Sequence, residues 1–220
     1  MGLAQINLQA AGRYMIAHEL TWGNAGNISA RSAPDRALIT ASGTRLGELQ
    51  EGDLIEFAFD DKGTVEGSRR PSKETPMHRA VYQVRPDIHA VLHAAPFYST
   101  LLACTSLEIP SNWFVEAMYY LERIGRVPYH HPGSEALGAA VRERATEANV
   151  LLLENHGVLV YDTSVQEALM ALHTLELAAR MVITSRTAQL PINPLEPEIV
   201  HDFLHNSGYR PRREWPQNDD

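Results

Sequence analysis

The sequence has little cysteine, few basic residues and no long apolar run, and each shortage excludes a class of protein. Its one cysteine, Cys104, excludes an intramolecular disulfide and any cysteine-rich metal site, and we expect it to be an inert core thiol. No apolar run reaches the ~18–20 residues of a membrane span. Residues 1–7 show no basic stretch followed by an apolar core, so we expect a cytoplasmic protein without a membrane partner.

The charge balance argues against a polyanion partner. The chain of 220 residues carries 19 Lys and Arg against 27 Asp and Glu, a formal net charge of −8, and we expect no nucleic-acid partner. Apolar residues make up 44% and charged residues 21%, which is typical of a globular protein. We find no internal repeat or linker. The sequence therefore predicts a single domain over 1–220, in which 190–220 form a tail that packs loosely or on a neighbouring copy.

Apolar periodicity predicts helices alternating with short strands. Ser72 is the expected N-cap of a helix with Pro76 in its first turn, and Ser164 to Glu167 have the spacing of a capping box. The expected helices and strands are a helix at 5–20, a strand at 37–40, a hairpin of 54–59 with 64–67, a strand at 90–93, a helix after Pro96, a helix at 135–148, strands at 150–155 and 158–161, and a long helix to 187. Hairpins mixed with single helices favour a mixed or largely antiparallel sheet with helices on its faces.

Two histidines are placed where α/β proteins collect reactive groups. His93 and His156 each follow a buried apolar strand, and Glu74 stands near a helix start. Two imidazoles and a carboxylate could hold a divalent metal and leave positions open for a substrate. The alternative is that each histidine is half-buried and bonded to the backbone. Spacing alone does not decide between these interpretations.

A set of motifs carries a resemblance to a known family. Over residues 7 to about 187, the chain resembles the class II aldolase/adducin family. The matching segments are Gly26 to Arg31, Thr40 to Gly43, Ser72 to Glu74, Met77-His78, Arg85 to Asp87, Ala90 to His93, Leu151 to Gly157 and Leu175-Glu176. The resemblance implies a three-layer α/β/α sandwich on a mixed, mostly antiparallel sheet. It also implies a homotetramer with active sites at subunit interfaces, and it makes His78 a packing residue of a helix face.

The resemblance implies a metal site with one ligand missing. It assigns His93, His156 and Glu74 to the metal, but the second histidine of the family's His-x-His pair falls on Ala95. Three consequences stay open. Glu74 could complete a two-histidine, one-carboxylate site, another group could replace the lost ligand, or the metal could bind weakly or not at all. The candidate replacements are Glu116, His130 and His131.

The proton donor and the anion site complete the comparison. Phe114 stands where the sugar-phosphate aldolases have a proton-donating tyrosine, with Tyr119 and Tyr120 nearby, which puts aldol cleavage of that kind in doubt. The segment from Val127 to Ser134 resembles that of relatives acting as decarboxylases. By resemblance, the substrate anion is held by Gly26, Asn27, Ser42, Gly43 and Ser72, with Lys73 as an extra cation.

We therefore expect a metal-dependent carbon–carbon lyase, either an aldolase or a decarboxylase. Its substrate would be a small anionic molecule, a hydroxylated keto acid or a sugar phosphate. Zinc is the first choice of metal, with manganese or iron as alternatives, and Glu74 would be the catalytic residue, acting as ligand or as base. The contrasting hypotheses are a metal-free member that binds a partner and, as a weaker one, a non-haem iron oxygenase.

Overall fold

One mixed sheet organises the chain. The structure is a computed structural model that describes residues 2–60, 69–209 and 213–215. The strands of this part are β1 (Asn27–Ala33), β2 (Arg36–Thr40), β3 (Leu54–Ala58), β4 (Ala90–Ala94), β5 (Ile124–Val127), β6 (Val150–Leu153) and β7 (Gly157–Asp162). Their order is β3-β2-β1-β4-β7-β6-β5, and neighbours are antiparallel except for the parallel pair β5 and β6. The predicted mixed, mostly antiparallel sheet is confirmed.

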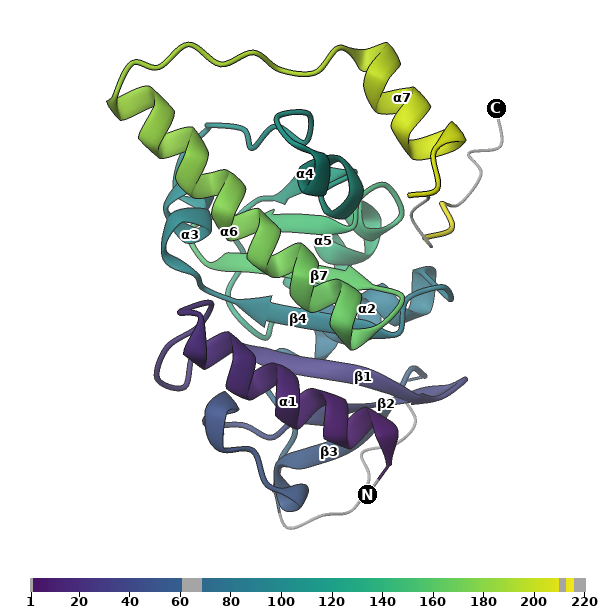
Figure 1. The fold of residues 1–220 in the computed structure, drawn as a ribbon. Helices are drawn as coiled ribbons and strands as arrows, with labels where there is room; N and C mark the ends of the chain where they lie inside the picture. Colours follow the sequence, from purple (N-terminus) through teal and green to yellow (C-terminus); the bar gives the residue numbers. More distant parts are fainter. Residues whose placement is uncertain (1, 61–68, 210–212, 216–220) are drawn as a thin grey trace.

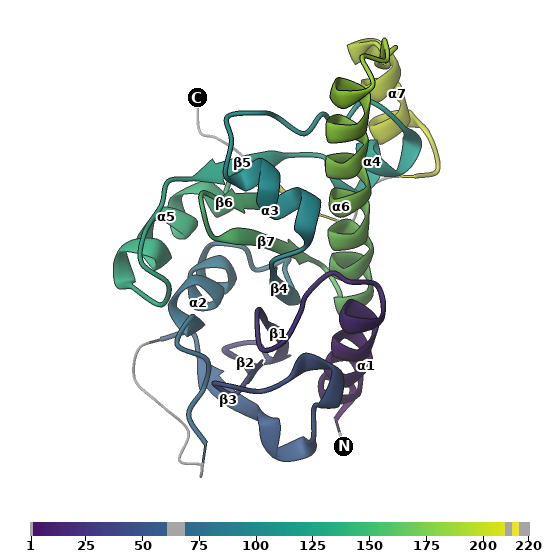
Figure 2. The ribbon, with the colours of Figure 1, turned by 90° about the vertical axis from the view of Figure 1, so that its left-hand side faces the viewer.

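Helices cover both faces of the sheet. They are α1 (Leu3–Ala17), α2 (Thr75–Val84), α3 (Phe97–Ala103), α4 (Val115–Tyr120), α5 (Glu135–Ala145), α6 (Val165–Thr187) and α7 (Pro197–Asn206). In Figure 2, α2 and α5 lie on one side of the sheet, and α1 and α6 lie on the other. Each side has its own buried apolar cluster, one containing residues of α2 and α5 and the other residues of α1, α3, α4 and α6. This is the predicted three-layer α/β/α sandwich.

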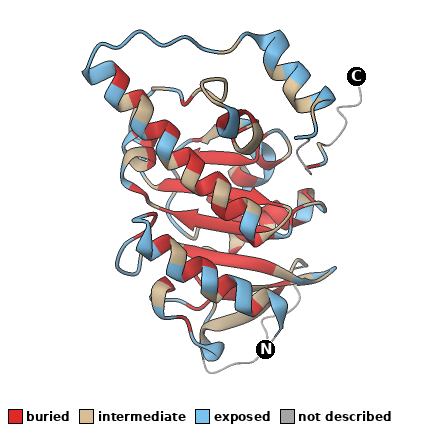
Figure 3. Ribbon diagram, viewed as in Figure 1, coloured by how far each residue is buried: buried red, intermediate tan, exposed pale blue. Residues whose placement is uncertain are grey.

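The central strands are apolar because both of their faces are covered. Along β4, Val91 belongs to the cluster on the α2 side, whereas Leu92 belongs to the cluster on the α6 side. Side chains alternate between the two faces of a strand, and a strand buried on both faces reads as a continuous apolar run. Figure 3 shows the middle of the sheet as buried. His93 follows Val91 by two positions and therefore faces α2.

Two local predictions need correction. Helix α2 is capped by Glu74 and not by Ser72. The amide of Ser72 donates to the carbonyl of Thr40 on β2, which keeps this residue outside the helix, while its hydroxyl accepts from the amide of Glu74 at 3.2 Å. Strand β4 continues through Ala94, so His93 lies inside a strand and does not follow one. The strand expected at 64–67 lies outside the described residues, and β3 pairs with β2.

Residues 213–215 are anchored more firmly than predicted. Helix α7 stands apart from the sheet at the end of an extended segment (Figure 1) and has no buried residue. The expectation of loose packing is nevertheless wrong for residues 213–215. The Arg213 side chain is 1% exposed and pairs with Asp162 and Glu122, and the Trp215 indole donates to Glu122 at 2.8 Å. The apolar pattern missed this contact because a buried ion pair has no periodicity.

Two further features concern surface properties. Cys104, predicted as a core thiol, is exposed, because it caps the C-terminus of the short helix α3. In the part of the chain that the structure describes, no helix has the length and apolar character needed to cross a membrane.

Candidate metal centre and cleft

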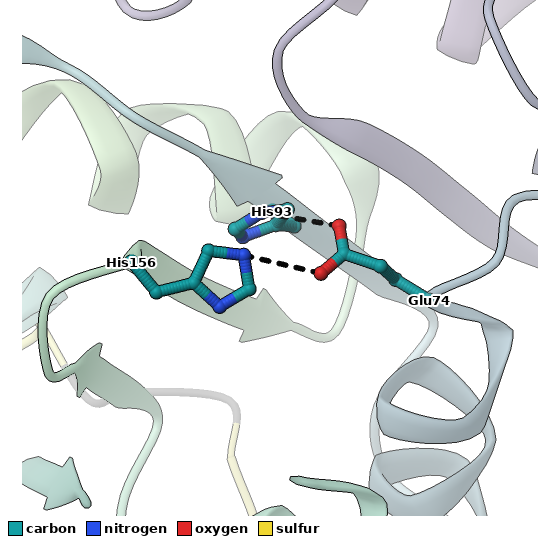
Figure 4. A group of neighbouring side chains, drawn as sticks. All are labelled: Glu74, His93 and His156. Atoms are coloured by element: carbon teal, nitrogen blue, oxygen red, sulfur yellow. Dashed lines mark ion pairs between the residues drawn. The ribbon is translucent and has the colours of Figure 1, made fainter. Parts of the chain in front are cut away.

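The fold brings together Glu74, His93 and His156, which are far apart in the sequence. Glu74 caps α2, His93 lies in β4, and His156 lies in the turn between β6 and β7. The His156 Nε2 atom is 3.1 Å from Glu74 Oε1, and the His93 Nε2 atom is 3.3 Å from Glu74 Oε2. Figure 4 shows both rings directed at the carboxylate. One potential ligand atom from each residue lies within 4.8 Å of the others.

Hydrogen bonding assigns the free nitrogen of His93. Its Nδ1 atom is 2.9 Å from the carbonyl oxygen of Val158 on the neighbouring strand β7, so Nδ1 carries the proton. Burial lowers the pKa of His93 although Glu74 acts to raise it, which favours the neutral ring. The lone pair of Nε2 then faces the carboxylate of Glu74. Two acceptors at this distance repel unless a cation lies between them.

The donor set therefore fits a divalent cation. Bonds of about 2.0–2.2 Å at tetrahedral or octahedral angles separate neighbouring ligand atoms by roughly 3 Å, close to the two distances from Glu74. Glu74 Oε1 is buried and has no hydrogen-bond partner, although it lies beside His156. Two imidazoles and one carboxylate suit zinc, manganese or iron. Of the predicted consequences of Ala95, this geometry favours completion of the site by Glu74.

The charge of Glu74 is strongly stabilised. Burial raises the pKa of this carboxyl, but the adjacent imidazoles of His156 and His93 and the amide of Asn27 outweigh it and lower the pKa to about 2. The Nδ2 atom of Asn27 donates to Glu74 Oε2 at 2.7 Å. Glu74 is thus ionised at neutral pH, as a metal ligand or a general base requires.

The three residues open into a cleft that also contains the predicted anion-binding residues. The cleft has a volume of about 400 Å³. Its lining includes Gly26, Ser42, Gly43, Ser72 and Lys73 in loops and Asn27 at the start of β1, together with Glu74, His93 and His156. Ser42, Gly43 and Lys73 are exposed on its wall. The structure thus brings the two predicted groups into one place.

The auxiliary candidates lie elsewhere within the described chain. Glu116 and Tyr119 line a different hollow, between α4 and residues of the C-terminal segment. His130 and His131 follow β5 and are not among the lining residues of the cleft, and His131 contacts the hydroxyl of Tyr129 at 3.2 Å. Phe114 caps α4 and packs against the core. The described lining of the cleft includes no tyrosine.

Several lining residues of the cleft and one buried contact were not predicted from the sequence. Trp22, which is 66% exposed, lines the cleft together with Thr44 and Pro132. Trp22 directly precedes the glycine-rich segment that it helps to shape, so proximity to that motif could have identified it. His78 is also more than a packing residue, since its ring contacts the amide of Asn27.

The backbone at Gly26 sets the distance between the loop before β1 and strand β4. Gly26 has φ +81°, and a Cβ atom there would lie 2.6 Å from the carbonyl oxygen of His93. We expect Gly26→Ala to lower the free energy of unfolding by about 1–3 kcal/mol, because it adds backbone strain and a clash. Urea denaturation checks this. Gly52→Ala is the matched control, since a Cβ atom there meets nothing within 4 Å. An equal loss in both variants would contradict the explanation.

The chain is an α/β/α sandwich in which two histidines and a carboxylate lie in a polar cleft. These features define a class of proteins whose site can hold a catalytic metal. Comparison with known proteins identifies the family. Residues 6–183 match the family described as Class II Aldolase and Adducin N-terminal domain. The chain belongs to that family.

Relatives in this family include both aldolases and decarboxylases. The chain is 34% identical over 188 residues to the 3-oxo-tetronate 4-phosphate decarboxylase of Haemophilus influenzae, covering 83% of this chain and 88% of the relative. It is 30% identical over 181 residues to the L-fuculose phosphate aldolase of Escherichia coli, covering 82% and 83%. A crystal structure of YgbL from Klebsiella pneumoniae, a putative aldolase/epimerase/decarboxylase, superposes with a TM-score of 0.82 at 29% identity and covers 91% and 97% of the two chains. The predicted class, a carbon–carbon lyase, is confirmed at the level of the family.

Proposed function

We propose that this protein is a metal-dependent decarboxylase of a small phosphorylated 3-oxo sugar acid. The observation that carries the proposal is a single cleft in which Glu74, His93 and His156 stand beside loops rich in hydroxyl and amide groups. The similarity to decarboxylases of 3-oxo-tetronate 4-phosphate supports this substrate class. The absence of a tyrosine from the described lining favours decarboxylation over aldol cleavage, because decarboxylation has no aldehyde leaving group to protonate.

His93, His156 and Glu74 would hold the metal ion, with zinc first and manganese or iron as alternatives. A bound ion would polarise the substrate carbonyl and stabilise the negative charge left when the carbon–carbon bond breaks. Loss of carbon dioxide leaves the electron pair of that bond on the substrate, and the carbon then takes up one proton. Glu74 is ionised and therefore serves as ligand or base. The open cleft admits the water that supplies the proton.

The loops opposite these residues would bind the phosphate. Ser42 and Ser72 offer hydroxyl donors, Gly43 offers a backbone position that a phosphate can approach closely, and Lys73 offers a charge. In this binding orientation the reacting carbons of the substrate lie near the histidines, and the unreactive phosphate lies at the loops. Binding energy from the phosphate then serves to position the bond that breaks.

Replacing Ser42 by alanine tests the phosphate site. One hydrogen bond to a charged group contributes about 1.5–3 kcal/mol, so we expect KM for the phosphorylated substrate to rise roughly tenfold or more while kcat changes little. Steady-state kinetics with the phosphorylated acid and with its dephosphorylated form provide the measurement. The dephosphorylated form should show the same weak KM in parent and variant. A loss confined to kcat would contradict the assignment.

Metal analysis of protein purified without added metal or chelator tests the proposal as a whole. We expect about one zinc, manganese or iron ion per chain, and its loss in the variant His93→Ala. Release of carbon dioxide from 3-oxo sugar-acid phosphates would then establish the reaction. Absence of metal after dialysis against each ion would overturn the proposal and favour a protein that only binds a ligand in this cleft.

Aldol cleavage of a sugar phosphate is the second candidate. A relative named 5-methylthioribulose-1-phosphate/5-deoxyribulose-1-phosphate aldolase, from Escherichia coli, is 35% identical over 157 residues and supports it. Release of an aldehyde in place of carbon dioxide would identify this activity. A homotetramer with active sites at its interfaces and a cytoplasmic location stay predictions from the family resemblance.

A further inference from the structure

A row of buried polar side chains leads from the core of the domain to Glu74. Glu74, His78 and Tyr82 are four residues apart and therefore form one stripe on α2. Asn27 and Ser29 are two residues apart and therefore share one face of β1. Residues Ser29 and His78 are fully buried, and Tyr82 and Asn27 are 3% and 7% exposed. Buried polar groups in such a row must satisfy one another.

Each neighbouring pair in the row is within hydrogen-bond distance. The Tyr82 hydroxyl lies 2.9 Å from Ser29 Oγ, which lies 2.7 Å from His78 Nδ1. The His78 Nε2 atom lies 2.6 Å from Asn27 Oδ1. The Nδ2 atom of Asn27 then donates to Glu74 Oε2 at 2.7 Å.

The carboxylate determines the direction of every bond. An ionised carboxylate only accepts, so Asn27 presents its amide nitrogen to Glu74 and its oxygen to His78. That oxygen also only accepts, and His78 must therefore carry a proton on Nε2. Burial, the largest effect, lowers the pKa of His78 to about 3, so the ring is neutral and its Nδ1 atom accepts.

The rest of the row follows from this tautomer. Because Nδ1 of His78 accepts, the hydroxyl of Ser29 donates to it. The oxygen of Ser29 is left as an acceptor, and the hydroxyl of Tyr82 donates to that oxygen. Every hydrogen bond thus points from the core toward the carboxylate of Glu74.

We propose that His78 is a positioning residue that fixes the amide of Asn27, and through it the rotation of the Glu74 carboxylate toward His93 and His156. The proposal rests on the metal-dependent function proposed above for the role of Glu74. Without the bond from His78, the Asn27 amide could turn and present its oxygen to Glu74. The hydrogen bond from the Asn27 side chain holds Oε2 of Glu74 and leaves Oε1 beside His156, which is the orientation that a shared cation requires.

Binding of Co²⁺ to the metal-free protein tests the role directly. His78→Leu keeps a similar side-chain volume but removes the hydrogen bonds of the ring with Ser29 and Asn27. We expect it to weaken Co²⁺ binding roughly 10–100-fold, which is typical for loss of a residue that orients a metal ligand. His78→Gln keeps an N–H donor near the place of Nε2 and should restore binding to within about threefold of the parent. Val81→Ala on the same helix is the matched control, because this buried side chain belongs to the apolar cluster. It should lower the unfolding temperature and leave Co²⁺ affinity unchanged.

Parental affinity in His78→Leu, or equal weakening in His78→Gln and His78→Leu, would overturn the proposal. Nitrogen-15 NMR of the histidine rings provides a readout that is independent of metal. We expect a neutral His78 at pH 7 with its proton on Nε2, and a proton on Nδ1 would overturn the proposal even if the protein binds metal. If the parent protein binds no Co²⁺ but His78 has the expected tautomer, the proposed function fails while the hydrogen-bonded row stands.

Discussion

Glu74→Gln is expected to reduce turnover by about 10²–10⁴-fold, the range for loss of an essential acid–base group. The change keeps the size of the side chain and removes its negative charge. The amide is uncharged and has a single oxygen, so either a bound cation loses a charged ligand or the substrate loses a base. Because the carboxylate is ionised in the folded chain, the loss should persist across the neutral pH range. Steady-state kinetics and metal content of the variant provide the measurement.

Two comparisons keep this prediction specific. Glu143→Gln removes an equivalent charge from an exposed position on α5 and should leave turnover unchanged. The unfolding temperature of Glu74→Gln should stay close to that of the parent, since the Glu74 side chain makes no capping hydrogen bond to the helix and Gln keeps an oxygen that can accept from Asn27. A fully active Glu74→Gln variant would remove Glu74 from the mechanism.

Arg213→Ala is expected to lower the free energy of unfolding by about 3–5 kcal/mol, the usual cost of removing one partner of a buried ion pair. The guanidinium lies 2.8 Å from Asp162 Oδ2, and the two side chains are 1% and 2% exposed. The same group donates to the carbonyl oxygen of Tyr119 at 2.9 Å. Removing it leaves the carboxylate of Asp162 buried without its cation. Urea denaturation monitored by circular dichroism measures the effect.

Two further variants separate the buried pair from a general effect of charge. Arg144→Ala breaks an exposed pair with Glu147, and such pairs contribute about 1 kcal/mol at most. The double variant Arg213→Met with Asp162→Leu should recover much of the lost stability, because it removes both charges together. A loss below 1 kcal/mol in Arg213→Ala would mean that the C-terminal residues do not hold this contact in solution.

Most of the sheet and the longer helices could be predicted because their patterns are local, whereas β5, α4 and α7 were not predicted. The run of apolar residues in β4 and β6 and the capping serine of α6 each depend on a few neighbouring residues. The predicted ends of helices and strands were wrong where a contact with a residue distant in the sequence determines the end. Ser72 is held by Thr40 on β2 and therefore does not cap α2.

The ligand set could be predicted only with the help of the family resemblance. Spacing alone left His93 and His156 compatible with ordinary buried histidines. The row from Tyr82 to Glu74 escaped prediction, although its residues have helical spacing, because its partners on β1 join it only through tertiary contact. Patterns of apolar residues carry no information about where a buried polar group finds its partner.

The ion pair between Asp162 and Arg213 also bears on the order in which the chain is made. The two residues are 51 positions apart, and Asp162 is the final residue of β7, the strand that comes last along the described chain. The chain is synthesised from its N-terminus, and domains generally fold as units. A nascent chain that has been synthesised as far as α6 therefore contains every residue that lines the cleft. Arg213, whose guanidinium pairs with the carboxylate of Asp162, has not yet been added. The reactive residues are thus all synthesised before Arg213, the residue that supplies the cation of this buried pair.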